Sequence, residues 1–165
     1  AVQGEHDESV APSELYKRGV IDPALFKELS RISMRLYERG VSRAADKGLI
    51  FVDTKYEFGI SKGKIMLMDE VNTPDSSRYW MADDYEKHFE KGEEPRKLDK
   101  EYVRTWLAEK GFTGDGKPPK LTDDLRMEAA ARYMQVVESF TEEPMQLEVG
   151  PVDESIYSIL NPFAY

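Results

Sequence analysis

The sequence DTKYEFGISKGKIMLMDEVNTPDSSRYW, residues 53–80, decides the fold because it alternates charged and apolar residues and then enters a Pro-Asp-Ser-Ser turn. On an extended strand, side chains two residues apart share a face. Asp53, Lys55 and Glu57 therefore project together, and the residues between them point the other way. This pattern predicts a hairpin with one ionic and one mostly apolar face. A solvated sheet face gives the same alternation, so the pattern alone does not establish a site.

The connection between the two expected strands determines which carboxylates share a face. The second strand, predicted at residues 65–71, contains Asp69 next to Glu70. We expect residues 61–63 to form a three-residue loop with Gly63 in the left-handed conformation. Such an odd-length loop places Asp69 on the same face as Glu57, whereas a two-residue loop would place it on the opposite face.

Two carboxylates close together on a rigid hairpin repel each other unless a cation lies between them. Oxygen ligands suit Mg²⁺, which takes one or two carboxylates and completes its shell with substrate phosphates. Glu57 and Asp69 are therefore candidate metal ligands. Lys55 would neutralise the same pair without any metal, and the spacing does not decide between the two readings.

Composition limits the classes of function. The chain has 165 residues, 40% of them hydrophobic, which is enough for one domain with a core. Its net charge of -9 argues against a nucleic-acid partner, which would require a basic stripe. The sequence has no cysteine for disulfides or thiolate metal sites, and no apolar run approaches the roughly 20 residues that cross a bilayer. Its start does not resemble a signal peptide, which fits the cytoplasmic location and absence of a membrane partner that we expect mainly from a family resemblance given below.

The rest of the chain predicts helices joined by polar segments. Asp22 and Pro23 supply an N-cap and a first-turn proline for a helix to about Lys47. Two further helices are expected at about 99–110 and 122–140. The charged stretch between them and the hairpin, residues 82–98, is expected to be a surface loop with the potential to act as a lid.

Three segments resemble a known family. DTKYEFG at 53–59, DEVNTPDSSRYW at 69–80 and DKEYVRTWL at 99–107 are similar to signature segments of phosphoribosylaminoimidazole-succinocarboxamide synthase, or SAICAR synthetase. The resemblance runs from GEHDE at 4–8 to about residue 138. It implies an α+β fold, an antiparallel sheet with packed helices, that forms the C-terminal lobe of a two-lobed ATP-grasp-like enzyme. Residues 1–140 would be this catalytic lobe, with the N-terminal lobe absent, and 141–165 a tail of unknown role.

The resemblance also implies a reaction. This family uses ATP to join L-aspartate to the carboxylate of the aminoimidazole ribonucleotide CAIR, giving SAICAR, ADP and phosphate in purine synthesis. The γ-phosphoryl group activates the carboxylate, and the aspartate amine then displaces the acyl phosphate. All three substrates are anionic, so cations and good positioning are expected to carry the catalysis.

Carried over by position, the resemblance gives each candidate residue a role. Glu57 and Asp69 would hold Mg²⁺ against the ATP phosphates. The ribonucleotide's phosphate and carboxylate would be bound by Lys55, Ser77, Arg78, Lys100 and Arg104. Lys55 and Asp53 would be catalytic, with Asp53 orienting Lys55 or the substrate's amino group, or else giving structural support.

The remaining candidates are less specific. His6 and Asp7, in the GEHDE segment, would contact aspartate or nucleotide. Asp75 is expected to cap its own turn. Arg104 has an alternative role as a surface arginine paired with the neighbours of Lys100 or with Asp99.

Two other functions stay open. The chain would be a non-catalytic binding or assembly module if its site residues are relics, or a Mg²⁺-dependent small-molecule phosphotransferase if the fold serves another substrate. Because the sequence supplies one side of a two-lobed cleft, we expect the isolated chain to be inactive and its partner to be the missing N-terminal lobe.

Overall fold

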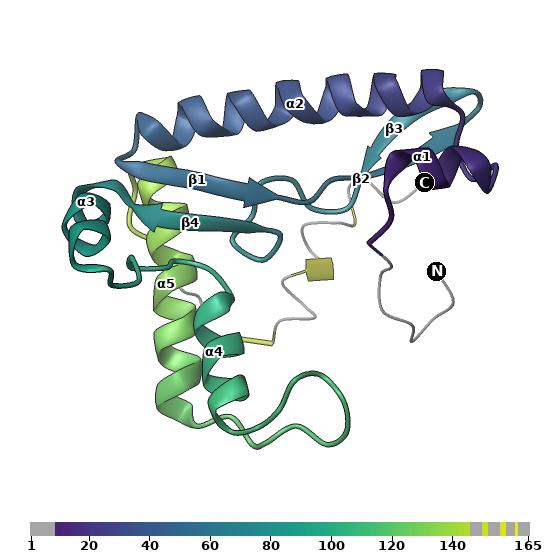
Figure 1. Cartoon of the computed structure of the whole chain (residues 1–165). Coiled ribbons are helices and arrows are strands. Elements are labelled where there is room, and N and C mark those ends of the chain that lie inside the picture. The colour runs from purple at the N-terminus through teal and green to yellow at the C-terminus, as the bar shows by residue number, and fades with distance from the viewer. Residues whose placement is uncertain (1–8, 146–149, 152–155, 158–160, 162–165) are drawn as a thin grey trace.

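The computed structural model describes residues 9–145, 150, 151, 156, 157 and 161 of the chain. Five helices and four strands lie within these residues (Figure 1). In chain order they are α1 (Pro12–Lys17), α2 (Pro23–Ala45), β1 (Leu49–Thr54), β2 (Glu57–Ser61), β3 (Lys64–Met68), β4 (Ser77–Met81), α3 (Ala82–Lys91), α4 (Glu101–Glu109) and α5 (Asp123–Thr141). The predicted α+β class with antiparallel strands is confirmed.

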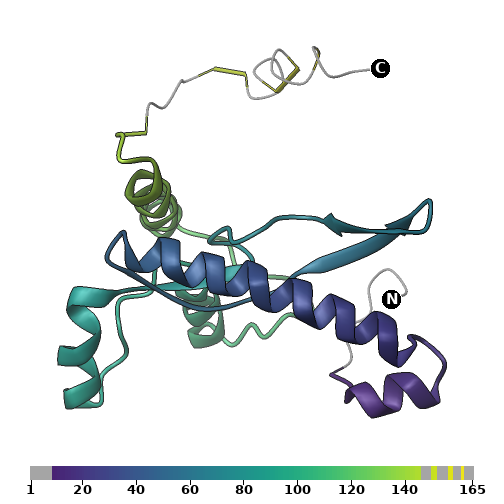
Figure 2. The same ribbon diagram turned by 90° about the horizontal axis from the view of Figure 1, so that it is seen from above.

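The strands form two separate antiparallel pairs. β1 pairs with β4, and β2 pairs with β3. The chain leaves β1 at Thr54 and starts β2 at Glu57, so the predicted single strand that carries Asp53, Lys55 and Glu57 is broken in the middle. Figure 2 shows the β2–β3 ribbon reaching away from the β1–β4 pair. The prediction of one ionic hairpin face is therefore wrong.

The turn between β2 and β3 also differs from the prediction. Ser61 pairs directly with Lys64, which leaves a two-residue loop of Lys62 and Gly63, with φ of 50° and 74°. Two positive φ angles are typical of a type I′ turn, whose twist matches that of the flanking strands. The expected three-residue loop is wrong.

Asp69 is consequently not aligned with Glu57 on the hairpin. Glu57 pairs with Met68, the last residue of β3, so Asp69 lies beyond the ladder and has a φ of 61°. The left-handed backbone at Asp69 turns the chain out of the strand.

Helix α2 begins and ends as the sequence predicts. The Asp22 side chain accepts hydrogen bonds from the backbone N–H groups of Ala24 and Leu25, both at 2.9 Å. The helix lies across β1 (Figure 1), and Gly48 after it adopts a φ of 67°. This positive φ lets the chain turn from the helix into β1.

A run of aromatic rings connects the layers of the fold. The ring centroids of Tyr37 in α2 and Phe51 in β1 are 5.3 Å apart, and those of Phe51 and Tyr79 in β4 are 5.1 Å apart. Tyr79 in turn contacts Phe140 of α5 at 5.9 Å, edge to face. The buried core around these rings consists of Ala44, Leu49, Phe51, Tyr79, Leu98 and Val136. The core therefore holds α2 and α5 against the β1–β4 pair.

The predicted surface loop at 82–98 is wrong in its first half, which forms helix α3. The Tyr85 ring stacks on that of Trp80, with 5.5 Å between ring centroids. It also stacks on Phe89, one helical turn further along α3, at 5.8 Å. Gly92 ends the helix with a φ of 67°. The following residues run beside β4, where the N–H of Leu98 donates to the carbonyl of Tyr79 at 2.9 Å. Aromatic stacking on the sheet stabilises a segment whose charge and glycine suggested a loop.

The last two helices confirm the prediction to within about a residue at most ends. Thr122 caps α5 by accepting from the N–H of Leu125. In the described part of the chain, no helix is both long enough and apolar enough to cross a membrane.

Candidate functional site

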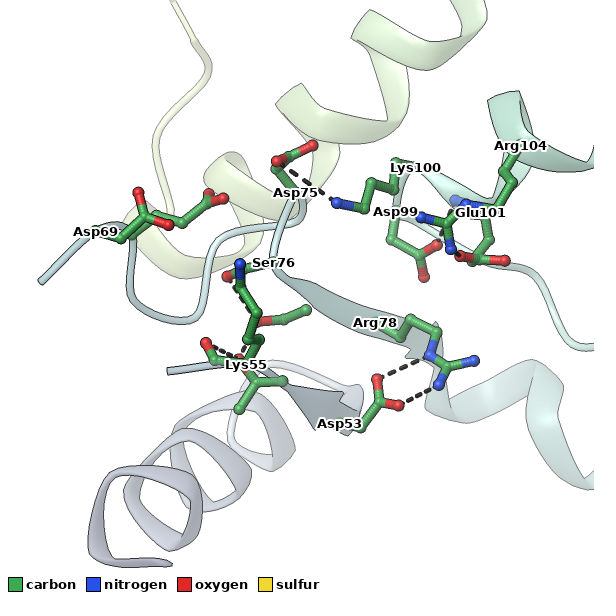
Figure 3. A pocket seen from close by; sticks show the side chains of 13 residues that line it. Asp53, Lys55, Asp69, Asp75, Ser76, Arg78, Asp99, Lys100, Glu101 and Arg104 are labelled. Atoms are coloured by element: carbon green, nitrogen blue, oxygen red, sulfur yellow. Dashed lines mark hydrogen bonds and ion pairs between the residues drawn. The ribbon is translucent and has the colours of Figure 1, made fainter. Parts of the chain in front are cut away.

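A cavity of about 570 Å³ opens where β1 ends and β4 begins, near the start of α4. Three segments line it: the end of β1, residues 69–78, and the start of α4 (Figure 3). The lining residues are Asp53, Thr54, Lys55, Asp69, Glu70, Asp75, Ser76, Ser77, Arg78, Asp99, Lys100, Glu101 and Arg104. Every residue predicted to bind the ribonucleotide is among them, although these residues are up to 49 positions apart in the chain (Lys55 to Arg104).

Asp53 and Arg78 face each other across the β1–β4 pair. A bulge after Phe51 brings them into register. Arg78 donates through Nε to Asp53 Oδ1 at 2.8 Å and through Nη2 to Asp53 Oδ2. This pair lowers the pKa of Asp53 below its usual value and raises that of Arg78, in both cases chiefly through the side-chain hydrogen bond. Asp53 therefore orients Arg78, and its expected roles toward Lys55 or the substrate's amino group stay predictions.

Ser77 is buried at the base of the cavity. Its hydroxyl is 2.8 Å from that of Thr54, the paired residue on β1. Its backbone N–H donates to the carbonyl of Thr73 at 2.9 Å, which closes the turn before β4. Ser77 is only 3% exposed, so its hydroxyl position is fixed by packing.

Asp75 does not cap its own turn. The hydroxyl of Thr73 accepts from the Ser76 N–H instead, at 3.4 Å. The Asp75 carboxylate lies 3.6 Å from Lys100 Nζ (Figure 3) and accepts from the Tyr133 hydroxyl at 3.4 Å. Burial, with the Asp75 charge, raises the pKa of Tyr133 to about 12, so this hydroxyl stays protonated. Asp75 thus connects α4 and α5 at the cavity.

Lys100 is the N-cap residue of α4, and Arg104 is the fourth residue of the helix. Arg104 forms an ion pair with Glu101, which matches its alternative role as an arginine paired near Lys100. Asp99, just before the helix, is 2% exposed. Its carboxylate accepts from the backbone N–H of Glu101 at 2.8 Å and from that of Tyr79 at 3.3 Å. Burial raises the pKa of Asp99, an effect that the two N–H groups oppose.

The two predicted metal ligands are not equivalent in the structure. Asp69 lines the cavity beside Glu70, across from Glu101 and Arg104 (Figure 3). Glu57 is not among the lining residues, and its carboxylate accepts from Lys55 Nζ at 2.6 Å. The described residues contain no group of three or more metal-ligating side chains. The Asp69 and Glu70 oxygens suit a hard cation that takes most of its other ligands from phosphates and water.

Both the sequence and the fold of this chain match known proteins. The model of the family described as SAICAR synthetase matches residues 1–120. The chain belongs to the SAICAR synthetase family. The phosphoribosylaminoimidazole-succinocarboxamide synthase of Bacteroides thetaiotaomicron is 46% identical over 145 residues, which cover 87% of this chain and 46% of that protein. The corresponding synthase of Cytophaga hutchinsonii is 40% identical over 94% of this chain and 51% of its own length.

Solved SAICAR synthetases share the fold. A structure of the Saccharomyces cerevisiae enzyme complexed with SAICAR matches with a TM-score of 0.68 at 31% identity, over 86% of this chain and 46% of that chain. A SAICAR synthetase in complex with ADP matches with a TM-score of 0.61 at 27% identity, over 86% of this chain and 48% of its own. The predicted family is confirmed, and the chain spans about half the length of the relatives it matches.

Sequence reasoning missed several cavity residues of this SAICAR synthetase chain. They are Thr54, Glu70, Asp75 and Asp99 as lining residues, Ser76, and Glu101. Asp99 carried a signal, since an aspartate ahead of a helical pattern predicts a cap, but its link to β4 is a tertiary contact. His6 and Asp7 lie outside the described residues.

Proposed function

We propose that this chain forms the ribonucleotide-binding part of a SAICAR synthetase. The reaction would join L-aspartate to the carboxylate of CAIR at the expense of ATP, giving SAICAR, ADP and phosphate. The observation that carries this proposal is a single cavity gathering four cations and a buried serine: Lys55, Ser77, Arg78, Lys100 and Arg104. The solved relatives complexed with SAICAR and with ADP support it.

The cations of the cavity suit an anionic ligand through exchange of partners. Arg78 pairs with Asp53, Lys100 with Asp75, and Arg104 with Glu101. These pairs are partly exposed, and exposed pairs contribute little to stability. A phosphate or carboxylate therefore has little to displace, and an arginine fork with two N–H groups engaged still has others to donate.

We place the phosphates of ATP, with Mg²⁺, at the Asp69 side of the cavity. Bound there, Mg²⁺ would neutralise the transferring phosphoryl group. Asp69 already lines the cavity. Glu57 would reach the cation only if its ion pair with Lys55 opened. That separation would also turn Lys55 toward the anionic substrates, so the Lys55–Glu57 pair would open on binding.

The remaining half of the SAICAR synthetase length is proposed to supply the other wall of the active site, as an N-terminal lobe. Phosphoryl transfer relies on preorganised groups around a site that excludes water. The cavity described here is open on one side, so the isolated chain should bind CAIR weakly and form no product. A cytoplasmic location is part of the proposal.

The test is a reconstitution. The purified chain is mixed with ATP, Mg²⁺, CAIR and L-aspartate, with and without the missing half of a related synthetase as a separate chain. We expect no SAICAR above background from the chain alone and measurable SAICAR from the mixture. Product from the chain alone would show that the active site is already complete.

The same assay separates the alternative functions. A non-catalytic module would bind CAIR in the mixture and give neither ADP nor SAICAR. A small-molecule phosphotransferase would release ADP without consuming L-aspartate. Absence of any CAIR binding to the chain or the mixture would overturn the proposed function.

A further inference from the structure

The β4 ladder and the start of α4 meet at one buried carboxylate. The N–H of Leu98 donates to the carbonyl of Tyr79 at 2.9 Å, which pairs the chain before α4 with β4. Asp99 follows Leu98 in the chain, and its side-chain Oδ2 accepts from the N–H of the same Tyr79 at 3.3 Å. The Asp99 carboxylate thus takes the place that a strand carbonyl would have in a continued ladder.

The other oxygen of the same carboxylate organises the helix. Asp99 Oδ1 accepts from the N–H of Glu101 at 2.8 Å, in the first turn of α4, where backbone N–H groups have no partner within the helix. Asp99 is 2% exposed, and its two carboxylate oxygens accept hydrogen bonds from two different elements, β4 and α4. A buried charge is costly, so its retention requires both bonds.

Each of these elements carries cavity cations. β4 carries Arg78, one residue before Tyr79, and the start of α4 carries Lys100 and Arg104. Resting on the proposed function, we propose that Asp99 is a positioning residue that sets the spacing between the Arg78 side and the Lys100–Arg104 side of the anion site. It acts through the backbone of both elements and does not touch the substrate.

This role makes a prediction that a purely structural cap does not. Asp99→Asn keeps the shape but offers one acceptor oxygen and one amide N–H, so it satisfies only one of the two backbone donors. Asp99→Ser retains an acceptor for the Glu101 N–H, as a capping residue, but is too short to reach Tyr79. Asp99→Asn should therefore lose one of the two bonds, and Asp99→Ser should lose the link to β4 and keep the helix start.

The first measurement uses the free chain and needs no ligand. Amide hydrogen exchange by NMR should be faster at Tyr79 in Asp99→Ser. In Asp99→Asn it should be faster at whichever of Tyr79 and Glu101 faces the side-chain amide NH2 group. Asp22→Ala, which removes the equivalent carboxylate cap of α2, is the matched control for loss of a cap away from the cavity. Wild-type exchange at Tyr79 in both Asp99 variants would overturn the proposal.

The second measurement is CAIR affinity in a thermodynamic cycle. Loss of charge-assisted positioning should weaken CAIR binding about tenfold in Asp99→Ser, and Asp22→Ala should bind as wild type. In a Lys100→Ala/Arg104→Ala background the Asp99→Ser effect should vanish, because coupled residues are not additive. An equal loss in both backgrounds, or wild-type affinity in Asp99→Ser, would overturn the positioning role.

The two measurements fail separately. If the wild-type chain binds no CAIR, the proposed function fails while hydrogen exchange still decides whether Asp99 joins β4 to α4. If CAIR binds and exchange at Tyr79 is unchanged in the variants, the proposed function stands and the inference fails.

Discussion

Replacing Arg78 with lysine tests the anion site at its best-defined contact. Lysine keeps the positive charge but loses the planar fork. Arg78 uses Nε and Nη2 to hold Asp53 and retains N–H groups on its outer edge for a ligand. A lysine ammonium is a single compact group without two separate edges. It would therefore make good hydrogen bonds to either Asp53 or the ligand, but not to both.

The expected magnitudes differ sharply between stability and binding. The side chains of Arg78 and Asp53 are each 48% exposed, so their pair contributes below about 1 kcal/mol to stability. A hydrogen bond from a charged donor to a ligand phosphate is worth about 1.5–3 kcal/mol. Loss of one such bond should weaken CAIR binding by about ten- to a hundredfold. Arg78→Lys should therefore unfold near the wild-type temperature yet bind CAIR much more weakly.

Calorimetric titration of the chain with CAIR measures the effect, and ATP is the comparison ligand. Arg31→Lys is the matched control, because Arg31 holds Glu28 through the same two nitrogens, at 2.9 and 2.6 Å, on α2. That control should bind CAIR as wild type. An equal loss for CAIR and ATP, or the same loss in the control, would contradict the assignment of Arg78 to the ribonucleotide.

The same substitution should change the response to acid. The hydrogen bond from Arg78 lowers the pKa of Asp53 in the folded state, so its contribution to stability is present above the unfolded pKa. It is lost as the pH falls through the lower folded value. Arg78→Lys should lose less stability than wild type between neutral and strongly acidic pH, measured by urea midpoints. Identical losses would show that the pair does not form in solution.

Three further predictions follow from the cavity and its supports. Glu57→Gln and Asp69→Asn should each weaken Mg²⁺-nucleotide binding in the reconstituted enzyme without unfolding it, and an unchanged Mg²⁺ dependence in both would remove the metal assignment. Tyr79→Phe removes the 2.6 Å hydrogen bond from a buried hydroxyl to the Asn72 carbonyl and should cost about 1–3 kcal/mol in denaturant unfolding. Gly63→Val places a branched side chain at a φ of 74° and should cost about 1–2 kcal/mol; wild-type stability would contradict the two-residue turn.

The sequence predicted the elements that depend on local chemistry. Asp22 and Thr122 cap α2 and α5 as expected, because a side-chain oxygen next to free N–H groups acts within a few residues. About half of the cavity residues were also predicted, through the resemblance to the SAICAR synthetase family. Their roles in binding remain predictions.

The misses share one physical cause, which is contact between distant segments. Alternation from Asp53 to Glu57 is compatible with one long strand, but β1 takes β4 as its partner and the chain breaks at Lys55. The α3 segment has a loop-like composition, yet stacking on Trp80 favours the helix. Helix α1 is only six residues long and gave no periodic signal.

These contacts converge on β4, and this convergence explains how a chain with a net charge of -9 holds four cations in one cavity. β1 supplies Asp53 to orient Arg78, the turn before β4 supplies Asp75 near Lys100, and α4 is tied to β4 by Asp99. Asp53 and Asp75 each pair with a cation at the cavity, and Asp99 holds the start of the helix that carries Arg104. Exposed charges more than a Debye length away, about 10 Å at 0.1 M salt, are largely screened. Local pairing therefore fixes the positions of the cations within an acidic chain, and in the proposed function the paired carboxylates orient the cations that would bind the anionic substrates.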